Sequence, residues 1–428
     1  MELSRRRLLQ AGLLAAAGGI TAACGGGSDD KGSGSGSGGS KEVDLWYWAG
    51  GLSDKVVADS VTHFAAQATV KPSIIGGDFK QKLTTTLAAG RSLPGITGIK
   101  GEDIAALLPQ AKQFVDLNTL GADKLQSQYL EWKWKQGSTQ DGKLIGFPID
   151  IGPTGLFYRA DLFEKAGLPT KPEDVAKQIV TWDDWFEAGK QLHGKVPKSF
   201  PVNTVQSILS AAIGQNTVRF IDTNNKFVGD QDHIRKAWDT ALKPLTLGID
   251  AKINDNSWNA AIANGTVAAE VGAAWHGLDI SSAGPDTKGK WRVAPTPSGP
   301  ANIGGSFLAI PAKGDNHDLA FQVITWLLNA DNQARGFTDA SLFPSAPAAY
   351  KLPALTGPDA FFGGQVTIDV FGPAAEKIPI AYEAPADAAV AAPFYNEIIK
   401  VETGKDANQA WSDAVSQAKS IAQKQGVS

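Results

Sequence analysis

Alternating hydrophobic and polar positions mark the beginning of a folded unit at residues 43–48. The run Val43-Asp-Leu-Trp46-Tyr-Trp48 is rich in β-forming residues and is followed by two glycines, so it predicts a first strand. Residues 53–66 then carry apolar side chains at helical spacing. Strand and helix patterns continue to alternate along the chain, which predicts an α/β fold built on largely parallel sheets.

Residues 144–168 predict a short strand, a crossover that contains glycine and proline, a second strand and a helix. We expect Asp161 to cap this helix, with Glu164 three residues further on, and Gly167 to end it. A further helix should begin after Thr181, because the sequence Thr-x-x-Asp is typical of a helix N-terminus.

Residues 289–312 predict two short strands around a turn rich in proline and glycine. The following segment should form a helix that docks on a sheet, since its apolar residues share one face: Leu319, Val323, Ile324, Leu327 and Leu328. Three prolines between residues 344 and 353 exclude a long regular element there.

The N-terminal segment has the organisation of an export signal. Three arginines at positions 5–7 precede an apolar stretch, residues 8–23, that is short for a membrane span. The ending Thr21-Ala-Ala-Cys24 resembles a bacterial lipobox, and residues 4–9 resemble a twin-arginine export signal. We therefore expect a signal peptide over residues 1–23, a lipid on Cys24 and a flexible tether to residue 40 that holds the protein at the outer face of the cell membrane.

The alternative to the lipobox is an ordinary signal peptide with an incidental cysteine. The alternative to twin-arginine export is the general secretory route. Cys24 is the only cysteine among 428 residues, so no internal disulfide can form.

Composition narrows the classes of function. Forty basic residues against 44 acidic residues, without long runs of either sign, argue against a nucleic-acid partner. The five histidines are scattered without metal-ligand spacing, so we expect neither a metal nor a cofactor. Twelve tryptophans against six tyrosines favour a ligand that is recognised through flat apolar faces.

Five stretches in this order together resemble the family 1 extracellular solute-binding proteins of ABC importers: residues 141–168, 181–189, 265–277, 289–311 and 320–333. The resemblance implies a periplasmic-binding-protein fold of type II, in which hinge strands join two α/β lobes around a ligand cleft. It also implies a monomer that is not an enzyme and that delivers a carbohydrate, captured by lobe closure, to the permease subunits of the transporter.

The resemblance also implies lobe boundaries. The first crossover between the lobes falls at residues 148–155, the return near Val293 and a third passage near Pro344. Lobe 1 is then residues 41–150 and 293–345, and lobe 2 is residues 151–292 and 346–428.

Sugar recognition needs aromatic planes for the C–H faces and fixed polar groups for the hydroxyls. Trp275, followed by His276, ends an apolar run and matches a family position that often stacks on a sugar; core packing is its alternative. Trp48 ends the first strand and either faces the crevice or is a buried strand residue. Trp258 lies in a polar loop, where an exposed indole would suit ligand contact.

The polar candidates come from the hinge and from the end of the chain. Asp150 is either a hydroxyl acceptor or a brace of the hinge, and Gly304-Gly305-Ser306 either lets the backbone approach a ligand or forms a tight turn. The resemblance adds three residues at the lobe 2 rim: Asp369, Tyr382 and Glu383. Trp132 and Trp134 should divide between the buried and the exposed face of a helix.

No arginine or lysine is among these candidates, so a neutral oligosaccharide is favoured over a charged sugar. The C-terminal order of residues 363–371 and 378–398 looks most like the arabino-oligosaccharide-binding branch of the family, although similar tryptophan-rich clefts serve cello-, xylo- and chito-oligosaccharides. The competing class is an anchored glycoside hydrolase, for which Asp150 and Glu383 would have to flank the scissile bond. A structural surface protein is disfavoured by the α/β crossover pattern.

Overall fold

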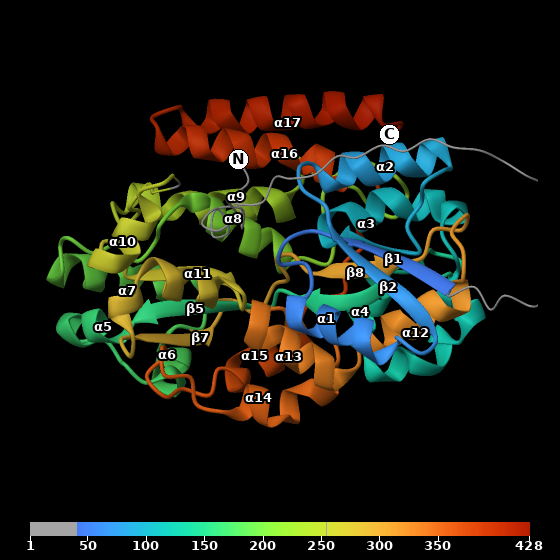
Figure 1. Ribbon diagram of the computed structural model, residues 1–428. Helices are drawn as coiled ribbons and strands as arrows, with labels where there is room; N and C mark the ends of the chain where they lie inside the picture. Colours follow the sequence, from blue (N-terminus) through green and yellow to red (C-terminus); the bar gives the residue numbers. More distant parts are fainter. Residues whose placement is uncertain (1–40, 254) are drawn as a thin grey trace, which may run out of the picture.

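The computed structural model describes residues 41–253 and 255–428 and contains two separate sheets (Figure 1). The six-stranded sheet has the order β2-β1-β3-β8-β4-β9 and the three-stranded sheet the order β6-β5-β7. The strands are β1 (Lys41–Tyr47), β2 (Ala68–Ile74), β3 (Ile96–Lys100), β4 (Phe147–Ile151), β5 (Thr154–Arg159), β6 (Ala269–Ala273), β7 (Trp291–Pro295), β8 (Ser306–Ala309) and β9 (Phe343–Pro344). The expected signal peptide, Cys24 and the tether lie outside the described residues.

The helices that surround the six-stranded sheet come mainly from the first third of the chain and from residues 317–340. They are α1 (Asp54–His63), α2 (Phe79–Ala89), α3 (Gly101–Leu107), α4 (Glu131–Gln136), α12 (His317–Leu327) and α13 (Ala330–Ala340). Three short 3-10 helices join α3 to α4: η2 (Leu108–Gln113), η3 (Leu117–Leu120) and η4 (Ala122–Gln128).

The remaining helices pack around the three-stranded sheet or lie beside it (Figure 1). They are α5 (Ala160–Ala166), α6 (Pro172–Gln178), α7 (Trp182–Lys195), α8 (Val205–Gly214), α9 (Asp232–Thr246), α10 (Trp258–Asn264), α11 (His276–Ala283), η5 (Pro285–Thr287), η6 (Pro347–Lys351), α14 (Pro353–Thr356), α15 (Ile368–Glu376), α16 (Asp387–Glu402) and α17 (Ala407–Lys424). No helix in residues 41–253 or 255–428 is long and apolar enough to cross a membrane.

The expectation of largely parallel sheets is wrong. Among the strands of the described residues, parallel pairing joins β1 to β2 and to β3, whereas β8 runs antiparallel to both β3 and β4. The three-stranded sheet is antiparallel throughout. The direction of β8 follows from the path of the chain. The chain reaches β8 directly from β7 in the other sheet, and not through a helix that packs on the six-stranded sheet. Such a strand can enter opposite to its neighbours.

The chain passes between the two sheets at three places. The first passage joins β4 to β5 through Gly152 and Pro153, within the expected residues 148–155. Val293 pairs with Phe157 inside the three-stranded sheet, and the chain leaves this sheet for the second passage after Pro295. The third passage leaves β9, where Pro344 pairs with Asp150.

Local capping follows the sequence at the start of α7 and at the end of α5, and departs from it at the start of α5. Thr181 and Asp184 form a reciprocal capping box on α7, and Gly167 ends α5 with φ of 73°, as expected. Asp161 does not cap α5, because Arg159 occupies that position. The carboxylate of Asp161 instead accepts two hydrogen bonds of 2.8 Å from the buried guanidinium of Arg159, which needs a counter-charge.

Helix α4 departs from its expected amphipathic pattern. Trp132 and Trp134 are both buried, 9% and 4% exposed, so the expected division between a buried and an exposed face is wrong. Trp132 donates a hydrogen bond of 2.9 Å from its indole to the carbonyl of Ala375, whereas Trp134 packs against Tyr129 and Phe147. The short helix is covered on the side of both tryptophans, and the ion pair of Glu131 and Lys135 occupies its solvent-facing side.

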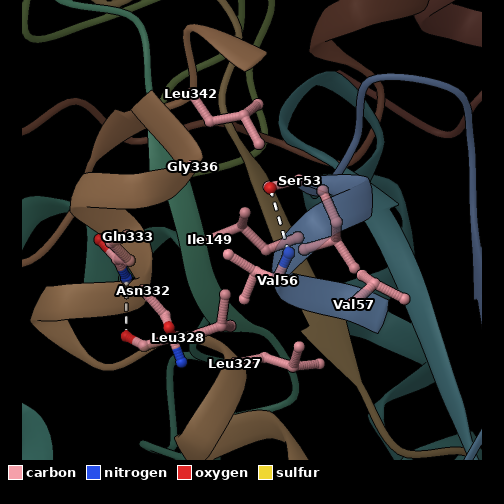
Figure 2. Close-up of a pocket in the computed structure, with 11 residues that line it drawn as sticks. Ser53, Val56, Val57, Ile149, Leu327, Leu328, Asn332, Gln333, Gly336 and Leu342 are labelled. Atoms are coloured by element: carbon pink, nitrogen blue, oxygen red, sulfur yellow. Dashed lines mark hydrogen bonds between the residues drawn. The ribbon is translucent and has the colours of Figure 1, made fainter. Parts of the chain in front are cut away.

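A small cavity lies between α1, α12, α13 and β4 (Figure 2). Its volume is about 20 Å³, room for roughly one water molecule. Mainly apolar side chains, among them Val56, Ile149 and Leu342, line it together with the backbone of Gly336. It is a packing gap in the core of the six-stranded sheet and too small for a ligand. The predicted apolar face of α12 supplies Leu327 to this core, as expected.

Candidate functional site

Three of the predicted site residues meet beside the three-stranded sheet. Trp275 and His276 follow strand β6 at the N-terminus of α11, and Trp258 is the first residue of α10. The ring of His276 lies 5.3 Å from that of Trp258 and 6.0 Å from that of Trp275, measured between centroids. All three side chains are half-buried, so they form an aromatic wall with an accessible surface.

Glu270, on β6, holds this wall in place. It is 2% exposed and accepts a hydrogen bond of 2.7 Å from the indole Nε1 of Trp258. Its second carboxylate oxygen lies 2.7 Å from Nε2 of His276, while Nδ1 of the same ring lies 3.3 Å from Asp279. Burial lowers the pKa of His276, but the two carboxylates outweigh burial and raise that pKa to about 10. His276 is therefore an imidazolium at neutral pH.

Sequence reasoning missed Glu270, although the chain carries a signal for it. The residue is the only charged one in the apolar run from Val267 to Trp275. A lone carboxylate in a buried strand requires hydrogen-bond donors from elsewhere in the fold. Trp258 and His276 are those donors.

The passage from β7 to β8 lies directly against the aromatic wall. The indole Nε1 of Trp275 donates a hydrogen bond of 3.2 Å to the carbonyl of Ile303. Gly304 and Gly305 have φ of 89° and 90°, a region that glycine adopts without strain. A Cβ on Gly305 would lie 2.7 Å from the carbonyl of Asp150. These glycines therefore allow the backbone between β7 and β8 to pack closely against strand β4.

A buried charge cluster lies behind this passage. Asp150 on β4 is 2% exposed and pairs with Ser306 of β8, and Lys133 on α4 has no exposed surface. Burial lowers the pKa of Lys133 to about 8, against the carboxylates of Asp150, Glu383 and Glu102, which favour its charged form. Its ammonium also lies 3.7 Å from the ring centroid of Phe307. Sequence reasoning missed Lys133, because three consecutive buried residues in α4 follow no single period.

Glu383 joins the cluster from the C-terminal part of the chain. Lys133 donates a hydrogen bond of 3.1 Å to the side-chain oxygen of Gln136. The amide nitrogen of Gln136 donates one of 3.1 Å to Oε2 of Glu383. The neighbouring Tyr382 pairs with Val218 through the backbone. The contact therefore joins α4, beside the six-stranded sheet, to a segment held on the other half of the molecule.

A cavity of about 820 Å³ opens beside this contact. Residues of the segments 105–142 and 380–385 line it, including the predicted Tyr382 and Glu383. Its lining contains none of the aromatic wall residues and none of residues 304–306. The large cavity and the aromatic wall are therefore two neighbouring parts of the region between the sheets.

Two predicted residues stand apart from these groups. The half-buried ring of Trp48 lies over Gly51 and Gly98, where a Cβ would come within 2.7 Å of it. Lys100, whose ammonium lies 5.8 Å from that ring, pairs with Ser306 and so connects Trp48 to the passage. Asp369 is exposed in the first turn of α15, and no hydrogen bond or ion pair joins it to the other candidates within the described part of the chain.

The site carries no arrangement of ligands for a metal in the part of the chain that the structure describes. Within residues 41–253 and 255–428, no three histidine, cysteine, aspartate or glutamate side chains are grouped so that they could hold an ion.

Residues 61–362 match the family of bacterial extracellular solute-binding proteins. The chain belongs to this family. As a solute-binding protein of the kind that serves ABC transporters, it is a binding protein and not an enzyme.

Two curated relatives of the solute-binding protein resemble it over most of its length. The lactose-binding protein of Rhizobium radiobacter is 26% identical over 79% of this chain and 83% of its own. The arabinooligosaccharide-binding protein of Bacillus subtilis is 26% identical over 68% of this chain and 70% of its own.

Solved structures confirm the type II fold that joins two α/β lobes. A family 1 extracellular solute-binding protein superposes with a TM-score of 0.83 at 28% identity, over 89% of this chain and all of its own. The galacto-N-biose/lacto-N-biose I-binding protein of Bifidobacterium longum gives a TM-score of 0.76 at 20% identity, over 92% of this chain and 99% of its own.

Proposed function

We propose that this solute-binding protein captures a neutral oligosaccharide between its two lobes and delivers it to the permease of an ABC importer. The observation that carries the proposal is the aromatic wall of Trp258, Trp275 and His276 beside the glycine passage at residues 304–305. Aromatic faces with fixed polar groups suit the C–H faces and hydroxyls of a sugar. Asp150, Ser306, Trp48, Tyr382 and Glu383 complete the proposed site, and Asp369 has weaker support because it stands apart.

The charges near the site favour a neutral ligand. Lys133 is the fully buried cation of the region, and the carboxylates of Asp150 and Glu383 oppose its charge. The imidazolium of His276 is likewise held by Glu270 and Asp279. A carboxylate on the ligand would therefore find cations that are already neutralised, with further carboxylates beside them.

Arabino-oligosaccharides are our leading ligand for two reasons. The C-terminal segments follow one another in the order seen in the arabino-oligosaccharide-binding branch, and one relative is an arabinooligosaccharide-binding protein. β-Galactosides are the second candidate, because the lactose-binding relative is 26% identical over a larger share of the chain. Cello-, xylo- and chito-oligosaccharides complete the set to be tested. The family resemblance supports capture rather than hydrolysis of the sugar.

The proposal includes a lipid anchor on Cys24 and a monomer that works at the outer face of the cell membrane. The lobes divide as residues 41–150 and 293–345 against residues 151–292 and 346–428, except that β7 joins lobe 2 and moves the return beyond Pro295. Lobe closure accompanies binding in this proposal, because a ligand that touches both lobes binds the closed state more tightly.

Calorimetric titration with a panel of sugars tests the function. The panel contains arabinobiose, arabinotriose, lactose, β-1,6-galactobiose, cellobiose, xylobiose and chitobiose, with galacturonate, glycine and a tripeptide as charged controls. We expect micromolar or tighter binding of at least one neutral sugar and its recovery intact by chromatography. Heat with only the charged controls, or cleavage of the bound sugar, would contradict the proposal.

A further inference from the structure

Two buried carboxyl side chains meet where helix α16 ends. Asp250, in the segment after α9, is 6% exposed, and Glu402, the last residue of α16, is 5% exposed. Their carboxyl groups lie within hydrogen-bonding reach of each other. Helix α16 also packs against α8, so the pair lies between segments that are far apart along the chain (Figure 1).

Glu402 is supplied with hydrogen-bond donors. Its Oε1 atom accepts a hydrogen bond of 2.6 Å from the hydroxyl of Thr204 and one of 2.7 Å from the backbone amide of Val205. Both donors belong to the N-terminus of α8, where the helix dipole favours a negative charge. These surroundings suit an ionised carboxylate at Glu402.

Asp250 lacks such donors. Its Oδ1 atom accepts a hydrogen bond of 3.0 Å from the backbone amide of Lys252, whereas its buried Oδ2 atom has no donor among the described residues. Two carboxylates in contact repel each other, and a buried acceptor without a donor is costly. One proton between Asp250 and Glu402 removes both costs. Burial and the charge of Glu402 accordingly raise the pKa of Asp250 to about 7, although the amide of Lys252 opposes the shift.

The neighbouring elements bring few other charges to the pair. The side chain of Lys252 favours the ionised form of Asp250. Residues 199–214, which include α8, contain no titratable side chain. The charged groups of the other adjoining helices have partners of their own: Lys243 with Asp183, His193 with the carbonyl of Ser199, and Glu397 with Lys400 and Lys405.

The segment 250–253 leads along the chain to Trp258 of the aromatic wall. The backbone amides of Ala251 and Ile253 donate hydrogen bonds of 2.8 and 2.7 Å to carbonyls of residues 202–203. The side chains of Ala251 and Ile253 pack in the same apolar cluster as Trp258. A second negative charge at residue 250 would push the segment away from the end of α16, and this displacement would reach Trp258.

We propose that Asp250 and Glu402 share one proton, and that this proton keeps Trp258 in its place in the aromatic wall. Asp250 is then a positioning residue for the sugar site, and sugar affinity falls when the proton is lost. The proposal rests on the proposed function and adds a dependence on pH to it.

The sign of this dependence follows from proton linkage. The pKa of an ordinary aspartate is 3.8, and the pKa of Asp250 in the folded protein is about 7. The stabilisation from the shared proton is therefore fully present below pH 3.8 and is lost as the pH rises through 7. Sugar binding should be tighter at pH 5.5 than at pH 8.5.

Calorimetric titration of the wild type and of Asp250→Asn with the neutral sugars of the panel, at pH 5.5, 7.0 and 8.5, tests the proposal. The amide of the variant can donate to Glu402 at every pH. We expect the affinity of Asp250→Asn, divided by that of the wild type, to rise from about 1 at pH 5.5 to about 3 or more at pH 8.5. Groups that titrate in both proteins cancel in this ratio.

Two further variants keep the test decisive. Glu402→Gln can donate to an ionised Asp250, so it should give the same rise and replaces Asp250→Asn if thermal unfolding shows that variant to be unfolded. Adding Asp250→Asn to Trp258→Ala should leave the pH dependence of sugar affinity unchanged, because the residue that the pair positions is gone. A rise that persists in the Trp258→Ala background would overturn the link between the pair and Trp258.

Infrared spectroscopy tests the proton without any sugar. The difference spectrum between the wild type and Asp250→Asn should contain the C=O band of a protonated carboxyl at pH 5.5 and lose it by pH 8.5. The absence of this band, or an affinity ratio that stays constant with pH, would overturn the proposal and leave sugar binding intact. Failure of the wild type to bind any sugar of the panel would refute the proposed function, whatever the infrared band shows.

Discussion

Glu270→Gln should remove the charge that keeps His276 protonated while it preserves the shape of the aromatic wall. The carboxamide can still accept the hydrogen bond from Trp258 and can donate one to a neutral imidazole. The pKa of His276 should then fall to its ordinary value of 6.5 or below, because burial lowers it and the largest opposing charge is gone. Asp279 remains, but its side chain is 45% exposed and screened.

The magnitude follows from proton linkage. The pKa of His276 is raised to about 10 in the folded protein and is 6.5 for an ordinary histidine. Its contribution to stability is therefore fully present below pH 6.5 and is lost as the pH rises through 10. This contribution is about 4 kcal/mol at pH 7 and falls below about 1 kcal/mol at pH 10. Glu270→Gln should lower the free energy of unfolding by up to that amount at pH 7 and by much less at pH 10.

Urea unfolding of both proteins at pH 6, 7, 8, 9 and 10, followed by tryptophan fluorescence, measures this difference. Groups that titrate in both proteins cancel when the two curves are subtracted, so the remaining pH dependence belongs to the altered pair. Asp279→Asn is the matched control and should cost less than about 1 kcal/mol, because its carboxylate is partly exposed. A difference between wild type and Glu270→Gln that is constant from pH 6 to pH 10 would refute the assignment of a buried, protonated His276.

Three further predictions test the packing, the wall and the anchor. Gly336→Ala should raise the free energy of unfolding by about 0.5 to 1 kcal/mol in thermal unfolding, since its Cβ would meet Leu342 at 3.8 Å beside the small cavity. The matched Gly189→Ala should lower the free energy of unfolding by about 1 to 3 kcal/mol, because its Cβ would lie 2.7 Å from Pro201. Equal effects of the two variants would contradict this packing. Trp275→Ala should weaken sugar binding by about 1 kcal/mol or more in calorimetry, and unchanged affinity would assign Trp275 to the core. Cys24→Ser should move the protein from the membrane fraction to the soluble fraction, whereas a lipid-modified variant would exclude this anchor.

The elements that depend on local sequence could be predicted well. The strand predicted at residues 43–48 forms as β1, Lys41–Tyr47, the helical pattern of residues 53–66 forms α1, and the capping box at Thr181 forms as its spacing indicates. Strand direction could not be predicted, because it depends on the passage of the chain between two sheets rather than on the residues of β8. For the same reason Val293, expected as the first residue of the second part of lobe 1, lies in the three-stranded sheet.

The candidate site shows the same division. The aromatic residues Trp258, Trp275 and His276 could be identified because each is conspicuous in its own segment of sequence. Their meeting point could not, since it depends on Glu270, which joins α10 to α11 from strand β6. Lys133 escaped prediction for a related reason: its burial depends on counter-charges from β4 and from residue 383, far away along the chain.

Hydrogen–deuterium exchange with and without the sugar that binds best tests most directly whether one ligand is held between the two lobes. We predict slower exchange at residues 270–277 and 302–306 together with residues 98–104 and 380–386, because closure around the sugar would cover surfaces of both lobes at once. Protection confined to one lobe, or unchanged exchange at saturating sugar, would contradict the account.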